Sequence, residues 1–579
     1  MIVPMKRVAV LCTASSENET LDALQSLGVL HVDSANRNET ASLKDAQSSF
    51  DAAAKALSIL KDSGCAANGK SVSSEEVLAT KARIDDLAAR IADGEHAVAT
   101  YAPFGEFSPN DLRALAAQGL EISLFRAPAD AIPASGEGLV IRVLAEDAKE
   151  KLAYGVAIGQ FEPAQGVELL PIPDKPASGI RAEVASLAAS LDAERKTLAG
   201  MGTESIAAEV AQRTSVRDFM AAAASMGAES GVKWLEGYLP EPRLQALADA
   251  AKKHGWGIAV RDPAEDEIPP TLVEPPKAFR PILPLFSMLG VLPGYRETDV
   301  SVVFYSFFTL FFAMLIGDAG YGLLILALTL FARRKLPKAP REPFILMGVL
   351  ACATIGWGVL TANYFGILPE ALPGWMKPRT VEWLANQSNI MQLCFIIGAV
   401  HLTIARLWNA ILLYPSRKAL AELGWVGVIW TMFCVASLVI VEGFVFPRFM
   451  FYVAGASVLL IALFMLDKSE LKTNGVQLGM LPLNIVSGLG DIISYVRLYA
   501  VGLSSVIVAQ NFNTMAMDLN LPLLVKIPCV ILILLLGHGL NLAMGALSIL
   551  VHAVRLNTLE FSNAKGITWS GYDYKPFRK

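Results

Sequence analysis

The sequence predicts a multi-domain chain. N-terminal α/β lobes joined by an antiparallel coiled-coil hairpin come first, and a C-terminal polytopic α-helical membrane domain follows. Charged residues are unevenly divided, with 71 in residues 1–300 and 32 in residues 301–579. Long apolar runs begin after Val300, and the mean hydropathy of the chain is +0.45. This combination is typical of a membrane domain and excludes a purely soluble enzyme.

The composition of the first half excludes further classes of protein. Residues 1–300 carry 29 basic and 42 acidic side chains, an acidic balance that argues against nucleic acid as a partner. The six cysteines are scattered without paired spacing, which excludes a disulfide-stapled secreted module. The run Val8–Leu11 is too short for a signal peptide, so we expect the soluble half to stay in the cytoplasm.

Two βαβ patterns predict a proximal lobe built from residues 1–40 and 228–275. Each pattern is a strand, a helix and a second strand, and the two together would assemble one ferredoxin-like sheet. The first consists of Val8–Leu11, Glu17–Leu27 and Val29–Asp33, and the second of Val232–Leu239, Glu241–His254 and Trp256–Arg261.

Heptad spacing predicts that residues 41–101 and 176–227 form the two arms of the hairpin. The a/d positions are Val77, Ile84, Leu87, Ile91 and Val98 in one arm and Ile180, Val184, Leu187, Leu191, Leu198 and Met201 in the other. Two helices of an ordinary bundle are the alternative. Residues 102–175 would form a distal lobe, with strands near Ile122–Arg126 and Leu139–Leu144 and a helix over Glu146–Tyr154. No phosphate loop or catalytic signature is visible in this half.

A proline-rich connector, residues 276–300, leads into a membrane domain over 301–562 and a cytoplasmic tail over 563–579. A crossing needs about 20 helical residues, and the apolar runs predict about eight helices, the last two long and tilted. The run 301–332 is too long for one crossing, so we expect two short helices that break at Gly317, Asp318, Gly320 and Gly322.

Loop charges predict the orientation of the membrane domain. The 333–341 loop has five basic residues, and the 414–419 loop has Arg417 and Lys418. By the positive-inside rule these loops are cytoplasmic, and so are the N-terminal domain and the C-terminus. The protein is then a multi-pass protein of the cell membrane.

Ionisable side chains inside apolar helices are candidates for function. Asp318 is expected to cap the helix that follows it, and Arg406 to reach the interface by snorkelling. Glu442 is equally compatible with a structural and a functional role.

The last two helices carry opposed polar stripes that predict an ion path. Arg497 is the central residue of the first stripe, and the alternative is a buried pairing that only locks two helices together. The first stripe contains Asp491, Ser494, Arg497, Ser504 and Asn511, and the second contains His538, Asn541, Ser548, His552 and Arg555, with Glu560 one and a half turns further on.

These motifs resemble the membrane subunit of V/A-type (vacuolar/archaeal-type) rotary ATPases, called subunit a in eukaryotes and subunit I in prokaryotes. The most specific matches are Ser494-Tyr495-Val496-Arg497-Leu498 and His552-Ala553-Val554-Arg555-Leu556, followed by Glu560-Phe561. Trp234-Leu235-Glu236-Gly237-Tyr238-Leu239-Pro240 and Pro269-Pro270-Thr271-Leu272 are also similar to the family, and the resemblance covers the whole chain.

The resemblance implies a non-catalytic stator subunit that provides two half-channels for H⁺ or Na⁺ against a rotating proteolipid (c/K) ring. Arg497 matches the family's essential arginine, Arg555 its second arginine, and Glu560 a carboxyl of the cytoplasmic path. Asp491, Ser494, Ser504, His538, Asn541, Ser548 and His552 are candidate lining residues. The implied partners are peripheral-stalk subunits (E/G type) on the lobes, a central-stalk subunit (d/C type) and the bilayer, with no cofactor or metal.

Two other functions stay open at this point. A secondary transporter with a cytoplasmic regulatory domain would be expected to carry internal repeats, and none is visible. A membrane-anchored scaffold would leave Arg497 and Arg555 in the hydrocarbon unexplained.

Overall fold

The computed structural model describes the chain except for residues 34–38, 129–131, 133–134, 137, 148–150, 162, 164–165, 338, 368–371, 375–380, 442 and 467–475. The chain divides into two compact units. The membrane unit contains Met1–Arg7, Tyr238–Leu244 and Val260–Lys575, and the lobe unit contains Val8–Gly237, Gln245–Ala259 and Pro576–Lys579.

The first sheet interleaves the two βαβ segments in the strand order β2-β8-β1-β9, with β7 paired to β8. Gly237 lets β8 approach β2 closely, because a Cβ at this position would lie 2.3 Å from the carbonyl oxygen of His31. The elements are β1 (Met5–Thr13), α1 (Glu17–Leu27), β2 (His31–Val32), β7 (Gly227–Glu229), β8 (Val232–Pro240), α7 (Leu244–His254) and β9 (Gly257–Arg261).

Residues that follow the last membrane helix complete the core of this lobe. The backbone N–H of Phe577 donates to the carbonyl oxygen of Leu30 at 2.8 Å, and the Phe577 ring lies 6.5 Å from that of Phe219. Lys579 pairs with Asp22 at 2.8 Å. Segments far apart in the sequence therefore share one small core.

Each predicted arm consists of two helices. They are α2 (Ala41–Asp62) and α3 (Ser74–Tyr101) in the first arm, and α5 (Ala177–Ala199) and α6 (Thr203–Ala224) in the second. Thr40 and Ser73 cap α2 and α3 through their hydroxyl groups. Helix α3 packs on α5 and α2 on α6, around a buried cluster that includes Leu60, Val77 and Leu198.

The second sheet has the order β4-β5-β3-β6, and here the prediction of a helix over Glu146–Tyr154 is wrong. Instead, β4 (Val140–Asp147) and β5 (Leu152–Ile158) pair antiparallel, with Asp147 opposite Leu152. The charged residues Glu146 and Asp147 are typical of a helix in composition, but they form the end of β4. The other elements are α4 (Pro109–Ala117), β3 (Ile122–Pro128) and β6 (Glu168–Leu170).

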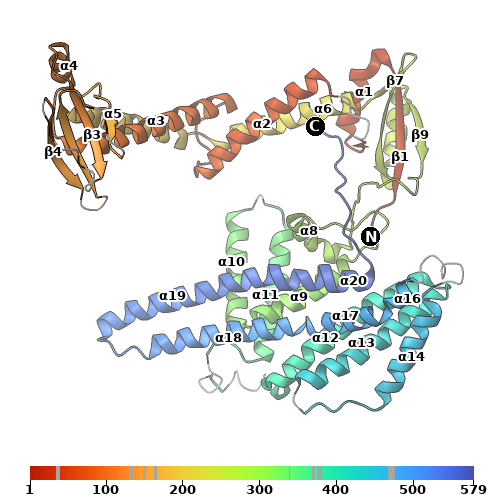
Figure 1. Ribbon diagram of the computed structural model, residues 1–579. Coiled ribbons are helices and arrows are strands. Elements are labelled where there is room, and N and C mark those ends of the chain that lie inside the picture. Colours follow the sequence, from red (N-terminus) through yellow and green to blue (C-terminus); the bar gives the residue numbers. More distant parts are fainter. Residues whose placement is uncertain are drawn as a thin grey trace. The chain divides into compact units, whose positions relative to one another are not determined.

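The membrane unit consists mainly of helices (Figure 1), and several of these are long and apolar. A short 3₁₀ turn, Lys277–Ile282, and α8 (Leu283–Leu289) precede them. The helices are α9 (Ser301–Ile316), α10 (Ala319–Lys335), α11 (Glu342–Leu360), α12 (Gln387–Leu413), α13 (Lys418–Ile440), α14 (Phe449–Phe464), α16 (Val476–Gly479), α17 (Leu481–Ile493), α18 (Val496–Met517), α19 (Leu523–Ser548) and α20 (Ser562–Lys565).

Five helices among the described residues are long and apolar enough to cross a membrane, and the bent pair α9 and α10 makes up to six. The two helices of this pair meet at 119°, at the residues where the sequence predicts a break. Helix α14 has only 16 residues. The expected number of about eight crossings therefore stays a prediction.

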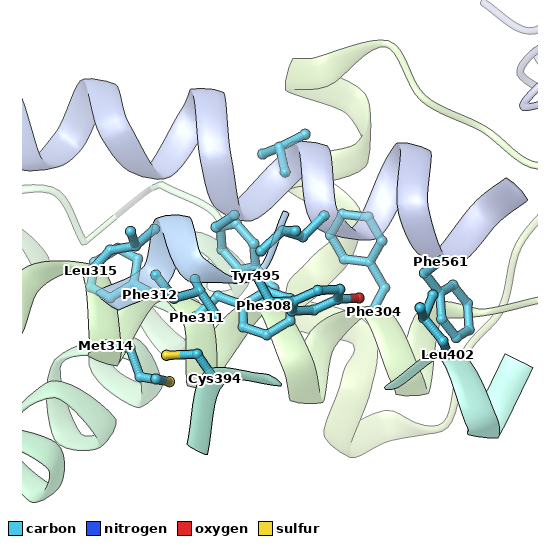
Figure 2. Close-up of a cluster of buried hydrophobic side chains, with 14 of the residues drawn as sticks. Phe304, Phe308, Phe311, Phe312, Met314, Leu315, Cys394, Leu402, Tyr495 and Phe561 are labelled. Atoms are coloured by element: carbon cyan, nitrogen blue, oxygen red, sulfur yellow. The ribbon is translucent and has the colours of Figure 1, made fainter. Parts of the chain in front are cut away.

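Aromatic side chains of α9 form the centre of the membrane unit (Figure 2). Phe304, Phe308 and Phe311 are each at most 2% exposed and pack with Tyr495 and Phe561, which come from the last two long helical segments. This cluster holds the beginning of α18 and the end of the last helix in fixed positions.

Candidate functional site

Arg497 lies one residue into α18, just after a break in the helical segment Leu481–Met517. Helix α17 ends at Ile493, and Ser494 and Tyr495 form a turn before α18 begins. The Nε of Arg497 donates to the carbonyl oxygen of Ser494 at 2.9 Å, and its Nη2 donates to Oε1 of Glu560 at 2.7 Å. The break therefore directs the guanidinium group towards the last helix.

Glu560 is placed by an unusual stretch of that last helix. Residues Ile549–Ala553 and Leu556–Phe561 have the π-helical hydrogen-bond pattern, in which residues five apart lie on one face. The Nε of Arg555 is accordingly 3.8 Å from the Oε1 of Glu560 that Arg497 contacts. A regular α-helix would have turned these two residues to different faces.

The burial of each arginine side chain determines how strongly it interacts with Glu560. The side chains of Glu560 and Arg497 are 5% and 22% exposed, whereas that of Arg555 is 53% exposed. Charges withdrawn from water interact more strongly, so the Arg497–Glu560 contact is the dominant one. The second oxygen of Glu560, Oε2, is buried and has no hydrogen-bond partner among the residues that the structure describes.

A polar cavity of about 480 Å³ lies between α12, α13 and α17. Asp491 lines it, together with Asn484, Ser487 and the ion pair of Arg406 and Glu422. That pair is 3.2 Å long, and the guanidinium of Arg406 also lies over the ring of Trp425. Arg406 is thus paired with a carboxylate near the start of α13, and the expectation that it reaches the interface by snorkelling stays a prediction.

A second cavity, of about 560 Å³, lies between α9, α11, α12 and α18. Its walls are mostly apolar, and Gln387, Asn363 and Gln510 contribute amides. On α18 it reaches only residues that follow Arg497, from Leu498 to Gln510, whereas the first cavity touches α17 only before Arg497, up to Asp491. The two cavities therefore lie on opposite sides of the arginine along this helical segment.

His538 and Asn541 belong to a hydrogen-bonded chain that joins three helices. Tyr321 of α10 is at its centre, with its hydroxyl 2.7 Å from Nδ1 of His538 and accepting from Nδ2 of Asn541 at 3.0 Å. Asn541 Oδ1 accepts from Ser505, and His538 Nε2 lies 3.1 Å from Oδ1 of Asn513. Tyr321, Ser505 and Asn513 were not predicted as members of this group, although Tyr321 lies within the predicted helix break.

Asp318 caps α10 as expected, and it has a second attachment that the sequence did not indicate. Its Oδ1 accepts from the backbone N–H groups of Gly320 and Tyr321, and its Oδ2 accepts from Gly366 at 3.0 Å. Gly317 has a φ of +69°, which favours glycine. A Cβ at Gly320 would lie 2.4 Å from the ring of Phe365, and one at Gly322 would lie 2.9 Å from Ile355.

The remaining candidates are not brought into this arrangement. The hydroxyl groups of Ser494 and Ser504 donate to backbone carbonyls of their own helical segments. Ser548 is partly buried and Asn511 is exposed, and Nδ1 of His552 is buried with no hydrogen-bond partner in the described part of the chain. Glu442 lies outside the described residues. Within the described part of the chain, no group of three or more His, Cys, Asp or Glu side chains has a geometry that would hold a metal ion.

Comparison with known proteins identifies relatives over the full length of the chain, although no family model matches it. The chain is 30% identical to the V-type ATP synthase subunit I 1 of Treponema pallidum and 29% identical to the V-type ATP synthase subunit I of Borreliella burgdorferi, with all of each chain covered. It is 27% identical to the A-type ATP synthase subunit I of Archaeoglobus fulgidus over 59% of this chain and 58% of that one. A solved cytoplasmic N-terminal domain of subunit I, a homologue of subunit a of V-ATPase, matches 44% of this chain and 100% of its own length, at 18% identity and a TM-score of 0.21.

Proposed function

This chain belongs to the subunit I family of V-type and A-type ATP synthases, and on that basis we propose that its last two long helical segments conduct H⁺ or Na⁺ past a rotating proteolipid ring. The subunit itself is non-catalytic in this proposal, and ATP is made or hydrolysed on other subunits. The full-length relatives do not support the alternative of a secondary transporter.

The contact between Arg497 and Glu560 carries the proposal. A cation beside a carboxylate favours the charged form of that carboxylate. A carboxyl of the ring that comes to Arg497 therefore releases its ion, and arginine suits this task because it keeps its proton even when desolvated. Glu560 partly neutralises the guanidinium, so the ring carboxylate can leave again.

The two cavities support separate access paths on either side of the arginine. The cavity at Asp491 touches Lys418, at the start of α13, and the cavity at Gln510 touches Gln387, at the start of α12. The positive-inside rule assigns the loop before Lys418 to the cytoplasm, so the loop before Gln387 is on the outer side. An ion would then enter on one side and leave on the other, and the positive charge of Arg497 prevents direct leak between the two paths.

The N-terminal half acts as the stator in this proposal. Its two lobes would bind peripheral-stalk subunits and would also contact the central-stalk subunit. Helices α2, α3, α5 and α6 would form the hairpin between the lobes, which their pairwise packing supports. Both termini are cytoplasmic in the proposed orientation.

The decisive experiment compares Arg497→Ala and Arg497→Lys with the unsubstituted complex in ATP-driven ion uptake by vesicles, with assembly checked by pull-down. Arg497→Ala is expected to abolish uptake while the complex still assembles. Arg497→Lys should fail largely, since an ammonium group can lose its proton when desolvated and lacks the planar donors. Near-normal coupled uptake by an assembled Arg497→Ala complex would refute the proposal.

A further inference from the structure

A fully buried histidine connects the surroundings of both members of the ion pair. His401, on α12, has no exposed surface. Its ring is stacked between Phe307, at 4.0 Å and 21°, and Phe561, at 4.5 Å and 13°. Its Nδ1 lies 2.8 Å from the hydroxyl of Tyr495. The imidazole therefore contacts three helical segments from within a fourth.

Two of these contacts lie next to the ion pair in sequence. Tyr495 ends the turn between α17 and α18, two residues before Arg497. Phe561 directly follows Glu560 in the π-helical stretch. Figure 2 shows both Tyr495 and Phe561 among the buried side chains of this cluster. A displacement of the His401 ring would thus move the backbone on either side of the Arg497–Glu560 contact.

Helix α12 packs closely against the ring of Tyr495. Gly398, one turn before His401, faces the tyrosine ring so closely that a Cβ there would lie 2.6 Å from it. The hydroxyl of Tyr495 then reaches His401, and the tyrosine has no exposed surface. A close approach combined with a buried hydrogen bond specifies one position for the ring, because a buried hydroxyl without a partner is costly.

We propose that His401 is a positioning residue that sets the separation of Arg497 from Glu560, through Tyr495 on one side and Phe561 on the other. This inference rests on the proposed function, because it assigns His401 a role in the same ion path. If the contact between Arg497 and Glu560 is loosened, ions can leak directly from one access path to the other. Fewer ions are then transported for each ATP hydrolysed.

The test must separate positioning from simple loss of structure. His401→Phe keeps a ring in the stack but leaves the Tyr495 hydroxyl unsatisfied, and Tyr495→Phe leaves Nδ1 of His401 unsatisfied. The double variant removes both partners, which can be nearly neutral for stability. All three are made in the complete complex, and ion uptake, ATP hydrolysis and assembly are measured in the same vesicles.

We expect both single variants to assemble less well and the double variant to assemble normally. The ratio of ions transported to ATP hydrolysed should nevertheless fall about fivefold in the double variant, which is the factor that one net hydrogen bond supplies. A purely structural role would lower uptake and hydrolysis together and leave this ratio unchanged. Thr354→Val is the control, because Thr354 is also fully buried but its hydroxyl bonds only within α11.

A normal ratio in the assembled double variant would overturn the inference about His401. That result would leave the proposed function intact as long as Arg497→Ala still abolishes uptake. Normal uptake by Arg497→Ala would instead remove the proposed function, whatever the His401 variants do.

Discussion

Nη2 of Arg497 lies 2.7 Å from Oε1 of Glu560, although the two residues are 63 positions apart in the sequence. The pair joins the beginning of α18 to the end of the last helix. Removing one partner of a buried ion pair leaves the other charge uncompensated, which costs about 3–5 kcal/mol. Substitutions of Arg497 and of Glu560 should nevertheless differ in their effect on ion uptake, because only Arg497 is proposed to meet the ring carboxyl.

Glu560→Gln should slow ATP-driven ion uptake roughly tenfold without abolishing it. Glutamine keeps the shape of the side chain but does not neutralise Arg497, so a ring carboxylate would be held more tightly and released more slowly. Glu342→Gln is the matched control, since Glu342 is an exposed carboxylate in the first turn of α11. Unchanged uptake by Glu560→Gln would contradict a role in ion access.

Arg555→Ala should have a milder effect, with uptake reduced by about threefold or less. The Arg555 side chain is 53% exposed and 3.8 Å from Glu560, and exposed pairs are worth about 0–1 kcal/mol. The measurement is uptake by Arg555→Ala and Arg497→Ala in parallel preparations. If Arg555→Ala proved as inactive as Arg497→Ala, exposure would be a poor guide to function at this site.

The two cavities predict opposite accessibility. Ser487→Cys, in the cavity with Asp491, should react with a membrane-impermeant thiol reagent only from the cytoplasmic side. Gln510→Cys, in the other cavity, should react only from the outer side. Both substitutions are made in a background without native cysteines, and labelling is compared in vesicles of each orientation. Labelling of both positions from the same side would contradict two separate paths.

Outside the membrane helices, Glu267 predicts a dependence of stability on pH. The hydrogen bond from Arg261 and the nearby charge of Arg7 hold the pKa of Glu267 below its ordinary value of 4.5. A carboxylate with a lowered pKa stabilises the folded state above its unfolded pKa, and this contribution is lost as the pH falls through the folded value.

Glu267→Gln should accordingly lower the Tm at pH 7, and the difference from the unsubstituted protein should shrink as the pH falls below the ordinary carboxylate range. The measurement is thermal unfolding of the full chain in detergent at several pH values. Glu265→Gln, which changes an exposed carboxylate two residues earlier, is the control. A difference in Tm that does not vary with pH would mean that charge is not the cause.

Particular residues explain how far the sequence predicted the site. The polar stripe identified Arg497, because an arginine in an apolar helix stands out in any periodic pattern. Glu560 was a candidate as well, but its contact with Arg497 was not predictable, because pairing between residues 63 positions apart does not follow from a local pattern. The approach of Arg555 to Glu560 was not predictable either, because a period of 3.6 residues puts them on different faces and the π-helical stretch does not follow from composition. His401 gave no signal either, since a lone histidine in an apolar run resembles any other core residue until its stacking partners are known.

Elements of the N-terminal half were also predicted where the signal is local and missed where it is not. Strands β8 and β9 were predicted to within one residue of their observed bounds, whereas β1 was predicted only over Val8–Leu11 and extends over Met5–Thr13. The pairing of β4 with β5 was missed because the charged residues at the end of β4 are typical of a helix in composition, and because the φ of +55° at Lys151 does not follow from composition. Pairing between β4 and β5 determines the strand conformation of this segment, and such pairing cannot be inferred from a local sequence pattern.

The position of Phe577 has a consequence for biosynthesis. The ribosome makes β1 and α1 of the first lobe at the start of translation, but Phe577, which packs against Phe219 and bonds to Leu30, comes after the last apolar helix. The core of the nascent lobe therefore remains incompletely packed until every transmembrane segment has left the ribosome. Native packing of this lobe is thus among the last events of folding, and a chain that stalls during membrane insertion exposes an incomplete apolar surface that chaperones and proteases recognise.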